Sequence, residues 1–108
     1  MQLLTASLRR SLPPIYGTEN TKDPLARVRF FTTWSSWTWY VIEFDGEDEC
    51  YGLVDGFEIE LGSFSLKELE SITGPMGLRV ERDLHFKPVR LSVLHAELEA
   101  ARRPAVMS

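Results

Sequence analysis

The sequence predicts an α+β fold in which a meander of three or four antiparallel strands is flanked by short helices. Short apolar and β-branched runs fill residues 25–64, turn-forming residues separate them, and helix-capping residues precede amphipathic stretches near both ends. With 108 residues, 44% of them hydrophobic, the chain has the size and apolar content of one domain with a packed core. We therefore treat residues 1–108 as a single domain.

The N-terminal region predicts one short helix followed by a loop. Thr5 can cap a helix that runs to Leu12, with Leu8 and Leu12 on one face. Pro13-Pro14 ends this helix, because the residue before a proline avoids the helical region. Residues 15–24 are rich in Gly, Thr, Asn and Asp and predict a loop.

Two strands are expected next, at Leu25–Thr33 and Trp37–Asp45, joined by a turn at Ser35-Ser36. The second is apolar on both faces, which predicts a central strand covered on at least one side by a helix. In strict alternation, one face carries Trp37, Trp39 and Val41, and the other carries Tyr40, Ile42 and Phe44.

The meander continues through an Asp45-Gly46 turn into a strand at Glu49–Phe57. Gly52 and Gly56 interrupt this strand and predict a bulge or a close backbone approach. Residues 58–64 begin with polar and apolar alternation, which is typical of a half-buried strand.

Two helices are predicted in the C-terminal half, separated by a short extended piece within residues 78–87. Ser65 and Glu68 form a capping box for a helix that ends at about Ile72, and Ser92 caps a final helix from Val93 to about Arg103, before Pro104. The expected inward residues are Leu66, Leu69 and Ile72 in the first helix, and Val93, Leu94, Leu98 and Ala101 in the second. Arg102 and Arg103 lie at the C-terminal end, where the helix dipole favours cations.

The charge of the chain is segregated. Its net charge is −4, but residues 43–60 hold eight of the sixteen acids and no Lys or Arg, while the remainder has twelve bases and eight acids. One interpretation is a solvated acidic hairpin that aids solubility. The other is a surface that meets a cationic partner, such as a groove that normally holds nucleic acid. A calcium site at residues 45–49 is not expected, because the ligand spacing of calcium loops is missing.

Four stretches carry a resemblance to a known family, namely Leu12–Asn20, Trp37–Asp48, Leu61–Leu69 and Gly74–Asp83. Together they resemble the domain of unknown function 2958, over roughly residues 3–91. The resemblance implies a protein of bacteria or phages that is common on plasmids and other mobile elements. It implies no reaction and no catalytic residues, and it favours a role in mobile-element biology, including defence against host immunity.

One alternative function depends on Glu81, Asp83 and His85. In an extended segment these three side chains share a face, where they could bind a divalent metal or perform acid–base catalysis. The other interpretation is an exposed strand face, or a salt bridge by one member. Cys50 is expected to be buried and inert, since neighbouring acids raise the pKa of a thiol.

These observations favour a small binding protein over an enzyme, with an accessory domain of unstated function as a further alternative. We expect its acidic hairpin to contact a basic surface on a protein partner, with Trp34 as an exposed aromatic anchor. The expected contact residues are Trp34, Glu43, Asp45, Glu47, Asp48 and Glu49. We expect no cofactor, no metal, no direct contact with nucleic acid and no membrane insertion. A single cysteine and the absence of a signal peptide predict a cytoplasmic protein.

Overall fold

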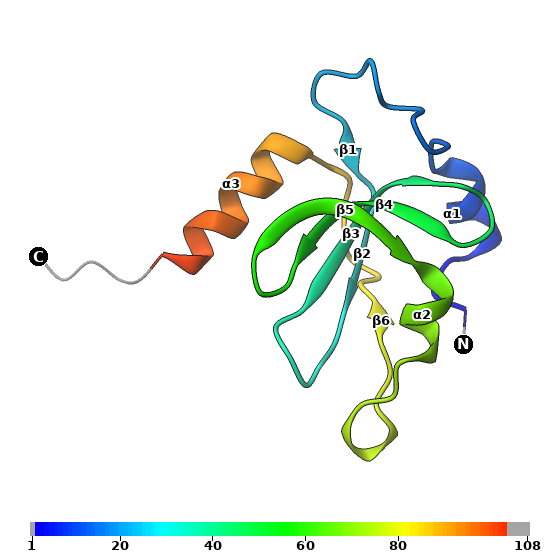
Figure 1. Ribbon diagram of the computed structural model, residues 1–108, viewed down its shortest axis with the longest axis vertical. Coiled ribbons are helices and arrows are strands. Elements are labelled where there is room, and N and C mark those ends of the chain that lie inside the picture. Colours follow the sequence, from blue (N-terminus) through cyan, green and yellow to red (C-terminus); the bar gives the residue numbers. More distant parts are fainter. Residues whose placement is uncertain (1, 104–108) are drawn as a thin grey trace, which may run out of the picture.

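The chain has an α+β fold in the computed structural model, which describes residues 2–103. Within these residues, a five-stranded antiparallel sheet has the order β5-β4-β3-β2-β6, and a second sheet pairs β1 with β7 (Figure 1). The predicted fold class is confirmed, and β6 extends the expected meander at the edge of β2. The elements are α1 (Ala6–Ser11), β1 (Leu25–Ala26), β2 (Val28–Phe31), β3 (Thr38–Phe44), β4 (Glu49–Asp55), β5 (Ile59–Ser65), α2 (Leu66–Ser71), the 3-10 turn η1 (Pro75–Gly77), β6 (Glu81–Arg82), β7 (Val89–Arg90) and α3 (Leu91–Arg102).

The first predicted strand, Leu25–Thr33, is in fact two strands that separate at Arg27. β1 pairs with β7, whereas β2 pairs with β3 and β6, so the two pieces serve different sheets. The Arg27 N–H still donates to the Val41 carbonyl, at 2.9 Å. The prediction was wrong here because local propensity does not reveal which partner each part of an extended run will find.

β3 is the central strand, as predicted, and all seven of its residues are buried. Its pairing with β4 shifts register between Val41 and Glu43, which makes Ile42 the extra residue of a β-bulge. Gly52 lies opposite this bulge, and a Cβ there would come within 1.7 Å of the Tyr40 carbonyl oxygen. The close backbone approach predicted at Gly52 is therefore confirmed.

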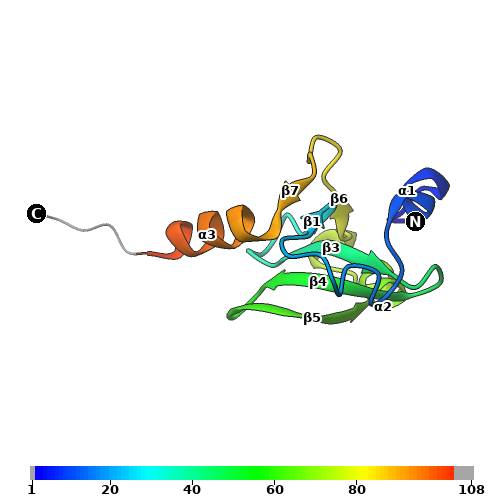
Figure 2. The ribbon, with the colours of Figure 1, turned by 90° about the horizontal axis from the view of Figure 1, so that it is seen from above.

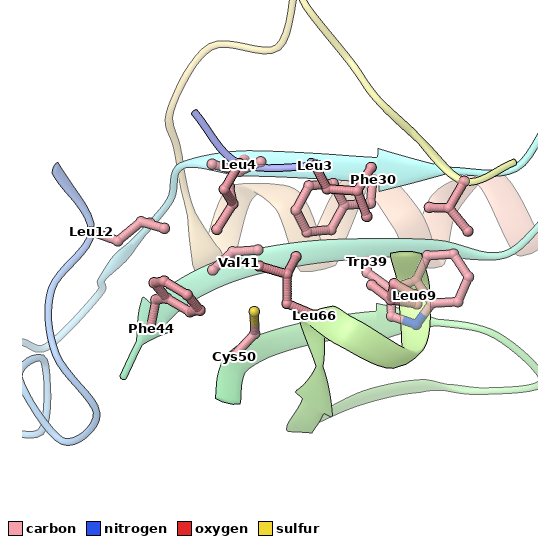
Figure 3. Close-up of a cluster of buried hydrophobic side chains, with 12 residues drawn as sticks. Leu3, Leu4, Leu12, Phe30, Trp39, Val41, Phe44, Cys50, Leu66 and Leu69 are labelled. Atoms are coloured by element: carbon pink, nitrogen blue, oxygen red, sulfur yellow. The ribbon is translucent and has the colours of Figure 1, made fainter. Parts of the chain in front are cut away.

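The bulge changes the facing of the last residues of β3. Trp39 and Val41 point into one core cluster and Ile42 into the other, as the alternation predicts. Phe44 was expected beside Ile42 but lies in the cluster of Trp39 and Val41 (Figure 3). The prediction was wrong because the extra residue reverses the phase of the alternation, so Ile42 and Glu43 lie on the same side of the sheet.

α1 and α2 cover the first cluster, and both helices begin at the predicted caps. The Leu8 N–H donates to the Thr5 hydroxyl at 3.1 Å, and the Glu68 N–H donates to the Ser65 hydroxyl at 3.1 Å. Ile72 was expected to face inward, but it lies beyond the end of α2 and is exposed. Leu66 and Leu69 are buried, as predicted, and Leu12 is buried in the same cluster (Figure 3).

α3 begins at Leu91, so Ser92 is its second residue and not its N-cap. The cap is supplied from the loop before β1: the Asp23 carboxylate accepts the Ser92 N–H at 2.9 Å and the Ser92 hydroxyl at 2.6 Å. The earlier start rotates the buried stripe, which contains Leu94 with the half-buried Leu91 and Leu98. Val93 and Ala101, two of the predicted inward residues, are exposed, and Pro104 lies outside the described residues.

Helices α1 and α3 lie at opposite ends of the five-stranded sheet. Figures 1 and 2 show α1 near the β3–β4 turn, and α3 extending from the other end, beyond the β4–β5 turn. None of the helices in residues 2–103 is long and apolar enough to cross a membrane.

Candidate functional site

The β3–β4 connection is a tightly ordered acidic turn, which we define as residues 45–49. One oxygen of the Asp45 carboxylate accepts the N–H groups of Glu47, Asp48 and Glu49, at 2.8, 2.7 and 3.0 Å. These hydrogen bonds favour the charged form and hold the pKa of Asp45 below its usual value. The turn therefore has a fixed backbone, from which the exposed side chains of Glu47 and Glu49 project.

Asp48 ties the acidic turn to the start of α2. Its carboxylate accepts the Lys67 N–H at 2.7 Å, and its two oxygens lie 2.9 and 2.8 Å from the Ser65 hydroxyl. These hydrogen bonds, together with the charge of Lys67, lower the pKa of Asp48. Asp48 thus supplies a second acceptor to the N-terminus of α2, beside the Ser65 cap. A surface hollow at this junction is lined in part by Asp48, Glu49 and Glu68.

A larger cavity of about 470 Å³ adjoins this hollow, and the two share Glu49 and Ser63. It lies between the α1–β1 loop (residues 13–24), strands β3 to β5 and the start of α3. Glu19, Glu43 and Glu49 contribute carboxylates to its wall, and none of its lining residues within the described chain is Lys, Arg or His.

Glu43 is the buried member of this group, with only 4% of its surface exposed. Its carboxylate accepts the Tyr16 N–H and the Thr18 N–H, each at 2.9 Å, and also the Thr18 hydroxyl. Burial raises the pKa of Glu43, but the hydrogen bonds from Thr18 and Tyr16 outweigh burial and leave the pKa below its ordinary value. Glu43 therefore holds the α1–β1 loop and does not belong to the exposed surface of the acidic turn.

The eight acids of residues 43–60 do not form one surface. The acidic turn lies at one end of β4, whereas Asp55, Glu58 and Glu60 lie at or near the other end, beside α3 (Figure 1). There Arg102 forms an ion pair with Asp55 and also donates to the carbonyls of Gly56 and Phe57. Arg102 thus partly neutralises the acids at this end of β4, while the charge of Lys67 acts on Asp45 and Asp48 in the acidic turn.

Trp34 does not join the acidic turn. It lies in the β2–β3 turn, at the opposite end of β3, and is half-buried. Its ring packs on Gly74, where a Cβ would come within 2.5 Å of the indole. Trp34 therefore anchors the loop around η1, whose Met76 is 99% exposed.

Glu81, Asp83 and His85 do not form a group that could hold a metal ion. Asp83 forms an ion pair with Arg29 at 3.3 Å and accepts the His85 N–H at 2.9 Å, because the chain turns after β6 and does not continue as a strand. No group of three or more His, Cys, Asp or Glu residues within 2–103 is arranged to hold a metal ion.

Cys50 is fully buried, and burial, with the charges of Asp48 and Asp45, raises its pKa to about 12.

The sequence matches one known family, described as "Protein of unknown function (DUF2958)", over residues 3–106. The chain belongs to this family. No curated protein and no solved structure is significantly similar to it. Membership in DUF2958 confirms the resemblance seen in the sequence.

Sequence reasoning missed the part of the site that the α1–β1 loop provides. Tyr16, Thr18 and Glu19 line the cavity together with Tyr51, whereas the sequence predicts only a loop at residues 15–24. The sequence did contain one signal: Tyr16, Thr18 and Glu19 bring an aromatic ring, a hydroxyl and a carboxylate close together in this loop. The loop lies far from the acidic segment in sequence. Only the fold brings the two together.

Proposed function

We propose that this protein is a small binding module that contacts a basic surface on a protein partner through its acidic turn. The observation that supports this proposal is the fixed backbone of residues 45–49, in which Asp45 and Asp48 accept five distinct hydrogen-bonding groups. The backbone that carries the exposed Glu47 and Glu49 therefore has little freedom left to lose on binding. Charge complementarity of this kind raises association rates and selects partners.

The partner chemistry follows from the sign and density of charge. Grooves that hold nucleic acid carry clustered Lys and Arg, which a compact set of carboxylates can occupy. Together with the mobile-element setting implied by the family resemblance, this favours an inhibitor of a host nucleic-acid-acting defence complex, of the anti-CRISPR or anti-restriction type, acting in the cytoplasm. Direct affinity for DNA is not expected, because the acidic turn repels phosphate.

The test compares three baits in a pull-down from the native host, quantified by mass spectrometry. The baits are the wild type, the Glu47→Lys/Glu49→Lys variant and the matched Glu58→Lys/Glu60→Lys variant, which changes the same charge at the other end of β4. Asp48 is left intact because it caps α2. A basic protein that the wild type and the control variant capture at least about tenfold better than the turn variant supports the proposal.

Two results would contradict it. Equal capture by all three baits would show that the acidic turn is not the contact. A partner that carries no basic surface, such as an acidic protein from the same mobile element, would point instead to an accessory domain without nucleic-acid mimicry.

A further inference from the structure

The cavity beside the acidic turn has the size and lining of a ligand site. Its volume of about 470 Å³ lies within the range of roughly 300–1,000 Å³ that is usual for small-ligand pockets. Ile42 and Pro24 provide apolar wall, Tyr16 and Tyr51 provide aromatic rings, and Glu43 and Glu49 provide carboxylates. This mixture suits a ligand with an apolar stem and a polar, positively charged end.

The fold places Glu43 in this cavity by a specific device. The bulge at Ile42 turns Glu43 away from the Val41 face, where strict alternation would bury it in the core. Bulges are frequent beside functional sites because they re-aim a side chain in this way. The buried carboxylate then anchors the α1–β1 loop through Tyr16 and Thr18, and so forms the wall of the cavity.

The charge of Glu43 is not compensated by a cation of the described chain. Its pKa is lowered, so the side chain is ionised at neutral pH, yet its contacts are neutral N–H and O–H groups. Three hydrogen bonds leave one of the roughly four acceptor positions of a carboxylate free. An ionised carboxylate that is 4% exposed and faces a cavity without Lys, Arg or His favours a cationic occupant.

We infer that this cavity receives an arginine side chain of the partner, an inference that rests on the proposed function. A guanidinium group is planar, stacks on aromatic rings and pairs with carboxylates through several N–H groups, and these are the chemistries that Tyr16, Tyr51, Glu43 and Glu49 offer. Tyr16 is 77% exposed, which leaves it accessible to an incoming side chain. Glu49 lines both the cavity and the neighbouring hollow, so one partner surface can reach the acidic turn and the cavity together.

The test is a titration of the ¹⁵N-labelled protein with N-acetylarginine N-methylamide, followed by amide chemical shifts. We expect saturable shifts at residues 15–19, 42–43 and 51, with a Kd on the order of 1–10 mM. The citrulline analogue has nearly the same shape without the charge and is expected to cause no saturable shift. Glu49→Gln is expected to weaken arginine binding at least about threefold, and the matched Glu60→Gln variant to leave it unchanged.

Several results would overturn the inference. One is an absence of saturable shifts up to about 50 mM arginine analogue, well above the expected Kd. The others are equal binding of the citrulline analogue and shifts located away from the cavity. The two proposals fail separately. A pull-down that depends on Glu47 and Glu49, without arginine binding, refutes only the pocket. Arginine binding without that dependence refutes a partner at the acidic turn and leaves the guanidinium site in the cavity standing.

Discussion

Replacement of Glu43 should destabilise the protein more than replacement of Glu47, an exposed acid of the acidic turn. In Glu43→Ala, the Tyr16 N–H, the Thr18 N–H and the Thr18 hydroxyl lose a charged acceptor. Hydrogen bonds to charged groups contribute about 1.5–3 kcal/mol each, but water can reach the loop and recover part of this. We therefore expect a loss of about 2–4 kcal/mol in the free energy of unfolding.

Glu43→Gln separates the charge from the shape of the side chain. The amide oxygen can still accept from Thr18, but the amide NH₂ then faces the Tyr16 N–H, and the expected loss is about 1–2 kcal/mol. The matched control is Glu47→Gln, because Glu47 is exposed and its side chain has no hydrogen bond within residues 2–103. Its effect should stay within about 0.5 kcal/mol.

The assay is urea unfolding followed by tryptophan fluorescence, repeated at several pH values. The pKa of Glu43 is lowered in the folded state from 4.5, so its stabilisation is present above about pH 4.5 and is lost as the pH falls through the folded-state pKa. The difference between the wild type and Glu43→Gln should therefore shrink in acid. A Glu43→Gln variant as stable as Glu47→Gln at pH 7, or a difference that does not change with pH, would refute the role assigned to this carboxylate.

Three further predictions test other features of the fold. Gly52→Ala should cost at least about 2 kcal/mol in urea unfolding, because a Cβ cannot lie 1.7 Å from the Tyr40 carbonyl oxygen, and a wild-type midpoint would contradict the bulge. Asp23→Ala should speed amide hydrogen exchange in the first turn of α3, since it removes the acceptor for Ser92, and unchanged exchange would show that the helix needs no such cap. Cys50 should resist thiol reagents at pH 8 until urea unfolds the chain, because its pKa of about 12 leaves almost no thiolate, and rapid labelling of the native protein would contradict its burial.

The parts of the fold that depend on local chemistry could be predicted from the sequence. The caps at Thr5 and Ser65 act within a few residues of their own helices, and the apolar run of β3 identifies a central strand wherever it pairs. The cap of α3 could not be predicted, because Asp23 lies 69 residues from Ser92 and only the pairing of β1 with β7 brings them together. Propensity contains no information about such tertiary contacts.

The candidate site could be predicted only in part, for a geometric reason. Acids at Asp45–Glu49 and at Asp55–Glu60 are close in sequence, but a strand of seven residues spans more than about 20 Å and carries the two groups to opposite ends of the sheet. The bulge at Ile42 leaves no mark in the polar and apolar pattern, so Glu43 could not be distinguished from its exposed neighbours. Charge density identified the segment, and the register of the strands decided which carboxylates act together.

The central claim is that a partner recognises the acidic turn. Its most direct test asks whether binding depends on the position of the negative charge or only on the net charge. Glu47→Gln/Glu49→Gln and Glu58→Gln/Glu60→Gln change the net charge equally, at opposite ends of β4. The affinity of each variant for the purified partner is measured by titration calorimetry at low and at high salt. For the first variant we expect a Kd raised at least about tenfold and a weaker salt dependence of binding, and for the second a nearly wild-type Kd. Equal weakening by both variants would show that overall acidity, and not the ordered turn, is recognised.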